Sequence, residues 1–167
     1  MIIICGAALC GVLDISAACI DAYMASGFTS GHVLQGVAGG LLGRRTFQGG
    51  LMTVTLGLVM HFTMAVTVTT IFYALTRRFP LPRRLYAVIA VGLCYGAAVF
   101  VVNNFGTAPL LSWVRSLYLH TPVLFKPPMG LSQFVIHLFC VGLPIALVTR
   151  YLSDSSKSSS LAVTRSR

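Results

Sequence analysis

The residues of this sequence that could do chemistry are acids, histidines and an asparagine set inside long apolar runs. Asp14 and Asp21 lie seven residues apart in the first run, so a helix places both on one face. His61 lies near the centre of a second run, Asn103 ends a third and His137 lies in a fourth. Ionisable side chains at membrane depth are costly, and by default they indicate a functional site. These five residues are therefore the candidate intramembrane polar site.

Proton handling is the chemistry that this set favours. A carboxylate stabilises the protonated form of a neighbouring imidazole, and histidine changes its charge near neutral pH. Asp14 with His61 or His137 could therefore form a proton relay. The alternative is purely structural, because the same groups could form hydrogen bonds between helices, each worth about 0.6 to 2 kcal/mol in a membrane. The sequence leaves both interpretations open.

Enzymatic and metal chemistry find little support in the sequence. The chain contains no Glu, has no HExxH pattern, and none of its five cysteines forms a CxxC pair. No serine has a GxSxG context. We therefore expect no catalytic residue, no metal site, no cofactor and no enzymatic activity.

The composition indicates which elements must position the polar residues. Of 167 residues, 56% are hydrophobic and 9% are charged, whereas soluble domains carry about 25% charged residues. Four runs are long enough to cross a bilayer as helices, which requires about 20 apolar residues. Their approximate bounds are 2–23, 51–76, 85–103 and 131–152. We therefore predict a single transmembrane domain over 1–152, an all-α bundle of four spans surrounded by the lipid bilayer.

A glycine-rich stretch, HVLQGVAGGLLGRRTFQGG over 32–50, connects the first two runs. It lacks the GxxxxGK[ST] spacing of a phosphate-binding loop and the GxGxxG spacing of a dinucleotide site. Glycines four residues apart let helices approach closely in lipid. Such pairs occur here and in the third run: Gly36 with Gly40, Gly39 with Gly43, and Gly92 with Gly96. We predict a short helix that packs between the first and second spans, either re-entrant or at the membrane interface.

The net charge of +9 does not indicate nucleic-acid binding, because the basic residues lie between or after the apolar runs and not along one face. Four spans place eight of these residues on the side of both termini: Arg77, Arg78, Arg83, Arg84, Arg150, Lys157, Arg165 and Arg167. The other side receives four: Arg44, Arg45, Arg115 and Lys126. Because basic loops stay inside, we predict cytoplasmic termini. The basic, serine-rich tail over 153–167 is predicted to be disordered.

Two further features shape the predicted bundle. In the connection over 104–130, the stretch LLSWVRSLYL has the apolar spacing of a short amphipathic helix lying on the outer surface. In the fourth run, Pro144 predicts a kink near Cys140, since proline removes one backbone hydrogen bond.

Five segments together carry a resemblance to known proteins: GVLDISAA, LQGVAGGLLGRRTFQGG, LGLVMHF, GLCYGAAVFVVNNF and HLFCVGLPIALVTR. With them, the chain resembles a group of small uncharacterised bacterial inner-membrane proteins of about four spans, and it is more distantly similar to the YagU-like family. The resemblance implies a helical protein of the bacterial inner membrane, similar to a family of which one member is associated with survival in acid. It implies no catalytic or binding residues.

Two functions fit these observations. The first is a structural or stress-associated multi-pass protein of the inner membrane, in which the polar residues hold the helices together. The alternative is an oligomeric, proton-linked channel or transporter for a small solute, in which Asp14, His61 and His137 face a wet path. Four helices are few for a monomeric transporter, so we also expect a homo-oligomer.

Overall fold

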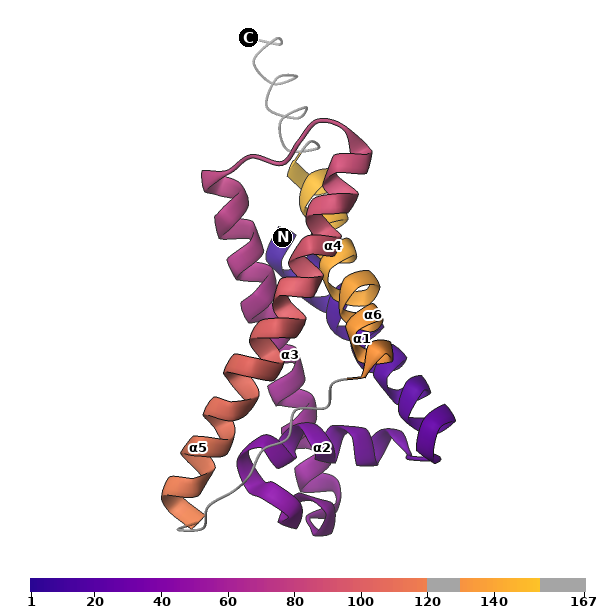
Figure 1. Cartoon of the computed structure of the whole chain (residues 1–167), viewed down its shortest axis with the longest axis vertical. Coiled ribbons are helices and arrows are strands. Elements are labelled where there is room, and N and C mark those ends of the chain that lie inside the picture. The colour runs from indigo at the N-terminus through magenta and orange to yellow at the C-terminus, as the bar shows by residue number, and fades with distance from the viewer. Residues whose placement is uncertain (120–129, 154–167) are drawn as a thin grey trace.

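Helices dominate the structure, a computed structural model that describes residues 1–119 and 130–153 (Figure 1). Four helical stretches are long and apolar enough to cross a membrane: Ile2–Ser26, Gly50–Arg78, Leu85–Tyr118 and Leu131–Ser153. No strand occurs within the described ranges. The prediction of an all-α protein with four long apolar helices is confirmed, and these helices indicate a multi-pass membrane protein.

The elements follow one another in a simple order. They are α1 (Ile2–Ser26), α2 (Ser30–Leu42), the 3₁₀ helix η1 (Gly43–Gln48), α3 (Gly50–Arg78), α4 (Leu85–Val102), the π-helix η2 (Asn103–Thr107), α5 (Ala108–Leu119), α6 (Leu131–Ile136) and the π-helix η3 (His137–Gly142). The last helix continues beyond η3 to residue 153.

A sharp corner separates α1 from α2. α1 ends at Gly27, whose φ of 67° is left-handed and whose backbone N–H donates to the carbonyl of Tyr23 at 2.8 Å. Thr29 then caps α2, because its side-chain oxygen accepts the backbone N–H of His32 at 3.4 Å. The chain therefore turns within three residues, and α2 runs across the direction of the long helices (Figure 1).

α2 packs on α3 through direct backbone contact. A methyl group at Gly57 of α3 would overlap the backbone carbonyl of Leu34 in α2. Hydrogen bonds hold the return from α2 to α3, since Thr46 donates its hydroxyl to the Gln35 carbonyl at 2.9 Å and Thr53 donates to the Thr46 carbonyl at 2.7 Å. The side chains of Gln35, Thr46 and Thr53 are all buried. The glycine-rich connection is thus folded tightly against α3.

The glycines singled out in the sequence differ in what they contact. Methyl groups at Gly92 and Gly96 of α4 would crowd the backbone of η3, and a methyl group at Gly142 of η3 would overlap the Gly92 carbonyl. In α2, a methyl group at Gly40 would lie 3.1 Å from a side chain of α5, whereas one at Gly36 would meet nothing within 4 Å. The contact between α4 and η3 is therefore the closest that these glycines permit.

The third long helix corrects the predicted boundary at Asn103. It runs from Leu85 through η2 into α5 and reaches Tyr118, so the predicted amphipathic helix is the end of this helix and not a separate element. The side chain of Asn104 donates to the Phe100 carbonyl at 2.8 Å, which satisfies the helix backbone without ending the helix. The stretch of 34 residues rises about 51 Å, against about 30 Å of hydrocarbon.

The fourth long helix carries a widened turn at the predicted kink. The π-helix η3 ends two residues before Pro144, whose missing N–H leaves the carbonyl of Cys140 without its usual partner. Residues 120–129 and 154–167 lie outside the described ranges. The rest of the third connection and nearly all of the predicted disordered tail fall there.

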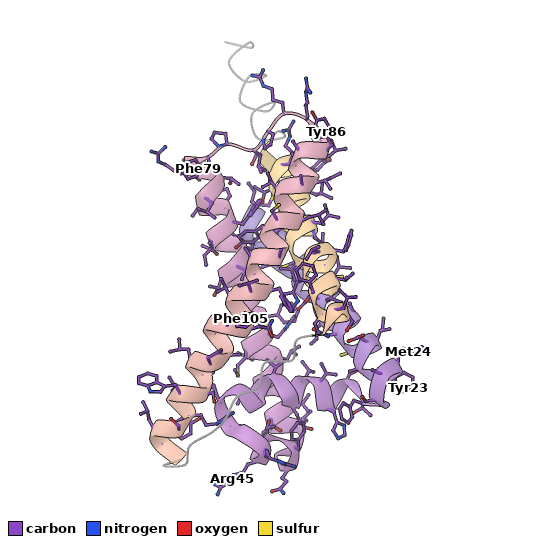
Figure 2. The ribbon with its side chains drawn as sticks, viewed as in Figure 1. Tyr23, Met24, Arg45, Phe79, Tyr86 and Phe105 are labelled. Carbon is purple, nitrogen blue, oxygen red and sulfur yellow. The ribbon has the colours of Figure 1, made fainter. Side chains whose placement is uncertain are left out.

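The apolar core lies toward one end of the bundle. Its buried members are Ala7, Cys10, Ala65, Val68, Phe72, Val88, Val141, Ile145 and Ala146. Phe79 and Tyr86 lie at this end of the molecule, whereas Tyr23, Met24 and Arg45 lie at the opposite end (Figure 2). At the opposite end α1 and α5 diverge, and α2 lies across them (Figure 1).

Gly57→Ala is expected to destabilise the protein, because its methyl group must displace α2, and overpacking costs about 1–3 kcal/mol. The measurement is thermal unfolding of the purified protein in detergent micelles. Gly36→Ala is the matched control and should unfold at or above the wild-type temperature, since alanine favours a helix over glycine. Equal unfolding temperatures for the two variants would contradict the contact between α2 and α3.

Candidate functional site

A cavity of about 570 Å³ lies among α1, α2, α3, the junction of α4 with α5, and the last long helix. Most of its wall is apolar. The polar side chains in the wall are Asp14, His32, His61, Asn103, Asn104, Thr107, Gln133 and His137. The core residues Cys10, Ala65, Val68 and Val141 also line it, so the apolar core forms its wall on the side of the N-terminus.

Four of the five residues of the predicted polar site line this one cavity: Asp14, His61, Asn103 and His137. Asp21 lies apart from it. Its carboxylate accepts hydrogen bonds from Ser132 Oγ at 3.0 Å and from Gln133 Nε2 at 3.1 Å, in the first turn of α6. A carboxylate is stabilised near the N-terminus of a helix. Asp21 therefore fastens α6 to α1.

The geometry of His61 fixes which ring nitrogen carries a hydrogen. Nε2 lies 2.9 Å from the backbone carbonyl of Gly11, and because a carbonyl can only accept, Nε2–H is the donor. In neutral His61 the lone pair then belongs to Nδ1, which lies 3.9 Å from Oδ2 of Asp14. The geometry thus brings an imidazole nitrogen that can accept a proton beside a carboxylate.

Asp14 is weakly tied into the bundle. Its Oδ1 atom is buried and has no hydrogen-bond partner among the described residues. Its Oδ2 atom faces His61 at 3.9 Å, which exceeds the length of a hydrogen bond. The side chain is 19% exposed, so burial deprives the carboxylate of most of its solvent without supplying partners in return. Arg115 Nε and Thr149 Oγ1 are also buried without a partner among the described residues, but of these three side chains only that of Asp14 lines the cavity.

His137 adds a second imidazole to the cavity wall. Its Nδ1 atom lies 2.8 Å from the carbonyl of Gln133, so Nδ1 carries a hydrogen. Its ring packs edge-on against Phe100, with the ring centroids 5.5 Å apart. Both His61 and His137 interact electrostatically with the carboxylate of Asp14. The cavity wall thus contains one acid together with the imidazoles of His61 and His137.

Arg115 has a role that its sequence context did not reveal. The predicted topology places Arg115 in the connection between the third and fourth spans, but its side chain is only 6% exposed. Nη1 donates to the carbonyls of Gly39 at 2.6 Å and Gly40 at 3.3 Å, and Tyr118 donates its hydroxyl to the carbonyl of Leu41. These carbonyls end α2, where a positive charge is favourable. α5 therefore holds α2 in place, through partners 75 to 77 residues away in the sequence.

Comparisons with known proteins assign no family. Neither protein-family models, nor curated proteins, nor solved structures match the chain. The resemblance to small bacterial inner-membrane proteins and to the YagU-like family therefore stays a prediction. The candidate site rests on the cavity and its residues alone.

Arg115→Leu is expected to loosen α2, because hydrogen bonds from a charged group are worth about 1.5–3 kcal/mol and the α2 carbonyls lose them. Thermal unfolding in detergent should show a lower transition temperature for this variant. Arg44→Leu makes the same change at an exposed arginine and should leave the transition within a degree or two of wild type, since surface substitutions have small effects. Equal transition temperatures for the two variants would contradict the role of Arg115 in binding the carbonyls that end α2.

Proposed function

We propose that the chain is a proton-linked transporter of the bacterial inner membrane, which moves a small solute, acts as a homo-oligomer and has no enzymatic activity. The observation that carries the proposal is Asp14, whose side chain lines the cavity and whose buried Oδ1 atom has no hydrogen-bond partner among the described residues. Ionisable groups at membrane depth mark pathways for protons and substrates. Of the two functions that the sequence left open, the geometry favours this one.

A purely structural role would require the polar side chains to join helices, and other residues do so. Asp21 joins α1 to α6, and His61 joins α3 to α1. Tyr95 joins α4 to α3, since its hydroxyl donates to the Val68 carbonyl at 2.6 Å. Asp14 Oδ1 makes no such bond. Its desolvation is therefore not offset by helix association, which supports a role in binding.

The basic residues support an orientation with both termini in the cytoplasm. Four arginines flank the turn between α3 and α4: Arg77, Arg78, Arg83 and Arg84. Arg150 of the last helix donates to the carbonyl of Pro82 in this same turn. Arg115, which belongs to the opposite side, is engaged in capping α2. Because positive charge stays inside, the cavity then lies toward the outer half of the membrane and takes up protons from outside.

A proton on the Asp14–His61 pair changes what the cavity can bind. The protonated pair is neutral overall, whereas the deprotonated pair carries one negative charge. A solute that binds one of these states better than the other is thereby coupled to the proton. Uptake of protons from the outer side accords with the acid-survival association that the resemblance implies.

Proton flux into proteoliposomes under an imposed pH gradient tests the proposal. The wild-type protein is expected to conduct protons, and Asp14→Asn and His61→Ala should lower the rate at least tenfold. Asp14→Asn should still unfold at or above the wild-type temperature, because it replaces a carboxylate that has no hydrogen-bond partner at Oδ1 with a neutral amide, which is less costly to bury. Asp21→Asn makes the same change in the same helix outside the cavity and should keep the flux.

Proton binding is measured beside flux, because a tightly coupled transporter retains its proton until solute is present. On acidification, Asp14→Asn in detergent should take up about one proton fewer per chain than wild type. Equal proton uptake by both proteins, with Asp14→Asn unfolding at a lower temperature, would assign Asp14 to helix association. That result would overturn the proposal in favour of a structural role.

A further inference from the structure

We infer that the solute is a small lipophilic monocation, an ammonium group on an aromatic or aliphatic body, which replaces the proton at Asp14. The inference rests on the proposed function and names its substrate class. Three features of the cavity carry it: an apolar wall, a single carboxylate, and a stack of aromatic rings.

The wall and volume fit a compact apolar body. Side chains of Ile15, Met60, Met64, Val99 and Leu111 line the cavity from four of its elements. Its volume of about 570 Å³ lies within the range of about 300–1,000 Å³ typical of small-molecule sites. Burial of apolar ligand surface against such a wall is favourable at about 25 cal/mol per Å². Methionine side chains also adapt to ligands of different shape.

The charge of the wall selects a cation. Among the described residues that line the cavity, Asp14 is the one acid, and none is Lys or Arg. Ionised Asp14 is therefore not balanced by a permanent positive charge of the protein. The Asp14 side chain lines the cavity and is 19% exposed, so an ammonium group in the cavity can lie beside the carboxylate and supply the missing charge. An anionic solute would be repelled by ionised Asp14 and would find no Lys or Arg among the described residues of the wall.

Aromatic rings add a second attraction for a cation. Phe28 and His32 stack with their ring centroids 5.7 Å apart, and His32 and Phe47 stack at 6.2 Å. All three side chains line the cavity and are exposed, which places the stack where the cavity meets its surroundings. Ring faces attract organic cations. The stack gives the cation a first contact before it reaches Asp14.

The proton and the cation compensate the same charge and so exclude each other. The titratable groups that line the cavity beside Asp14, or interact with its charge, come from α1, α2, α3 and η3: Cys10, His32, His61, His137 and Cys140. Histidine is the residue type among them that changes charge near neutral pH. When a cation binds to the protonated pair, one proton leaves for the solvent. The exchange is one cation for one proton.

Binding of benzyltrimethylammonium to the full chain in detergent micelles tests the inference. This probe keeps its charge at every pH, so any pH dependence belongs to the protein. Its affinity should rise about tenfold per pH unit while the pair loses its proton, as one-for-one competition requires. Asp14→Asn should weaken binding at least tenfold, whereas the matched variant Asp21→Asn should bind as wild type does. A pH indicator should record about one proton released per bound cation at the acidic end.

The neutral isostere neopentylbenzene separates charge from shape. Binding of the cation but not of the isostere, lost in Asp14→Asn, supports the inference. Equal binding of both probes, or unchanged affinity in Asp14→Asn, overturns it and leaves an apolar pocket. If the cation fails to bind while Asp14-dependent proton uptake persists, the substrate class alone is wrong. If that proton uptake is also absent, the proposed function fails with it.

Discussion

The approach of Gly57 to the carbonyl of Leu34 fixes α2 across the diverging ends of the long helices. Because glycine has no side chain, the two helix backbones meet directly, and α2 contributes to the cavity wall at close range. Arg115 secures α2 from the other side by binding the carbonyls that end it. The transverse helix, held by Gly57 and by Arg115, thus supplies one wall of the cavity among the long helices.

The buried polar groups divide into two kinds. Gln35, Thr46 and Thr53 bond to one another and to nearby carbonyls, so they fold the glycine-rich connection. The carboxylate of Asp21 likewise accepts hydrogen bonds from the first turn of α6. Asp14, Arg115 and Thr149 each have a buried atom without a partner among the described residues, and Asp14 differs from the other two because it lines the cavity. Contacts within the fold therefore account for most of the buried polar side chains, and they do not account for the carboxylate of Asp14 in the cavity.

The long helices could be predicted because a bilayer imposes a length and a composition on any segment that crosses it. The end of the third helix could not, since Asn104 bonds its own helix backbone where asparagine more often ends a helix. The role of Arg115 was equally hidden, because its partners lie in a distant segment.

The polar site was predictable in kind but not in membership. Apolar surroundings single out Asp14, His61 and His137 in the sequence, and the structure gathers them around one cavity. The spacing of seven residues also groups Asp21 with Asp14. It places Asp21 about 10 Å further along the helix, however, where Gln133 at the start of α6 donates a hydrogen bond to its carboxylate. Which residues meet depends on how the helices cross, and periodicity within one helix does not report that.

The two π-helices, η2 and η3, affect the direction in which residues of the cavity wall face. Each holds a polar residue of the wall, Asn103 in η2 and His137 in η3, and each contains one residue more than an α-helix of the same rise. One extra residue turns every residue that follows it by about 100° relative to an uninterrupted α-helix. The side chains beyond η2 and η3 therefore face directions that the regular helical period of the sequence does not predict.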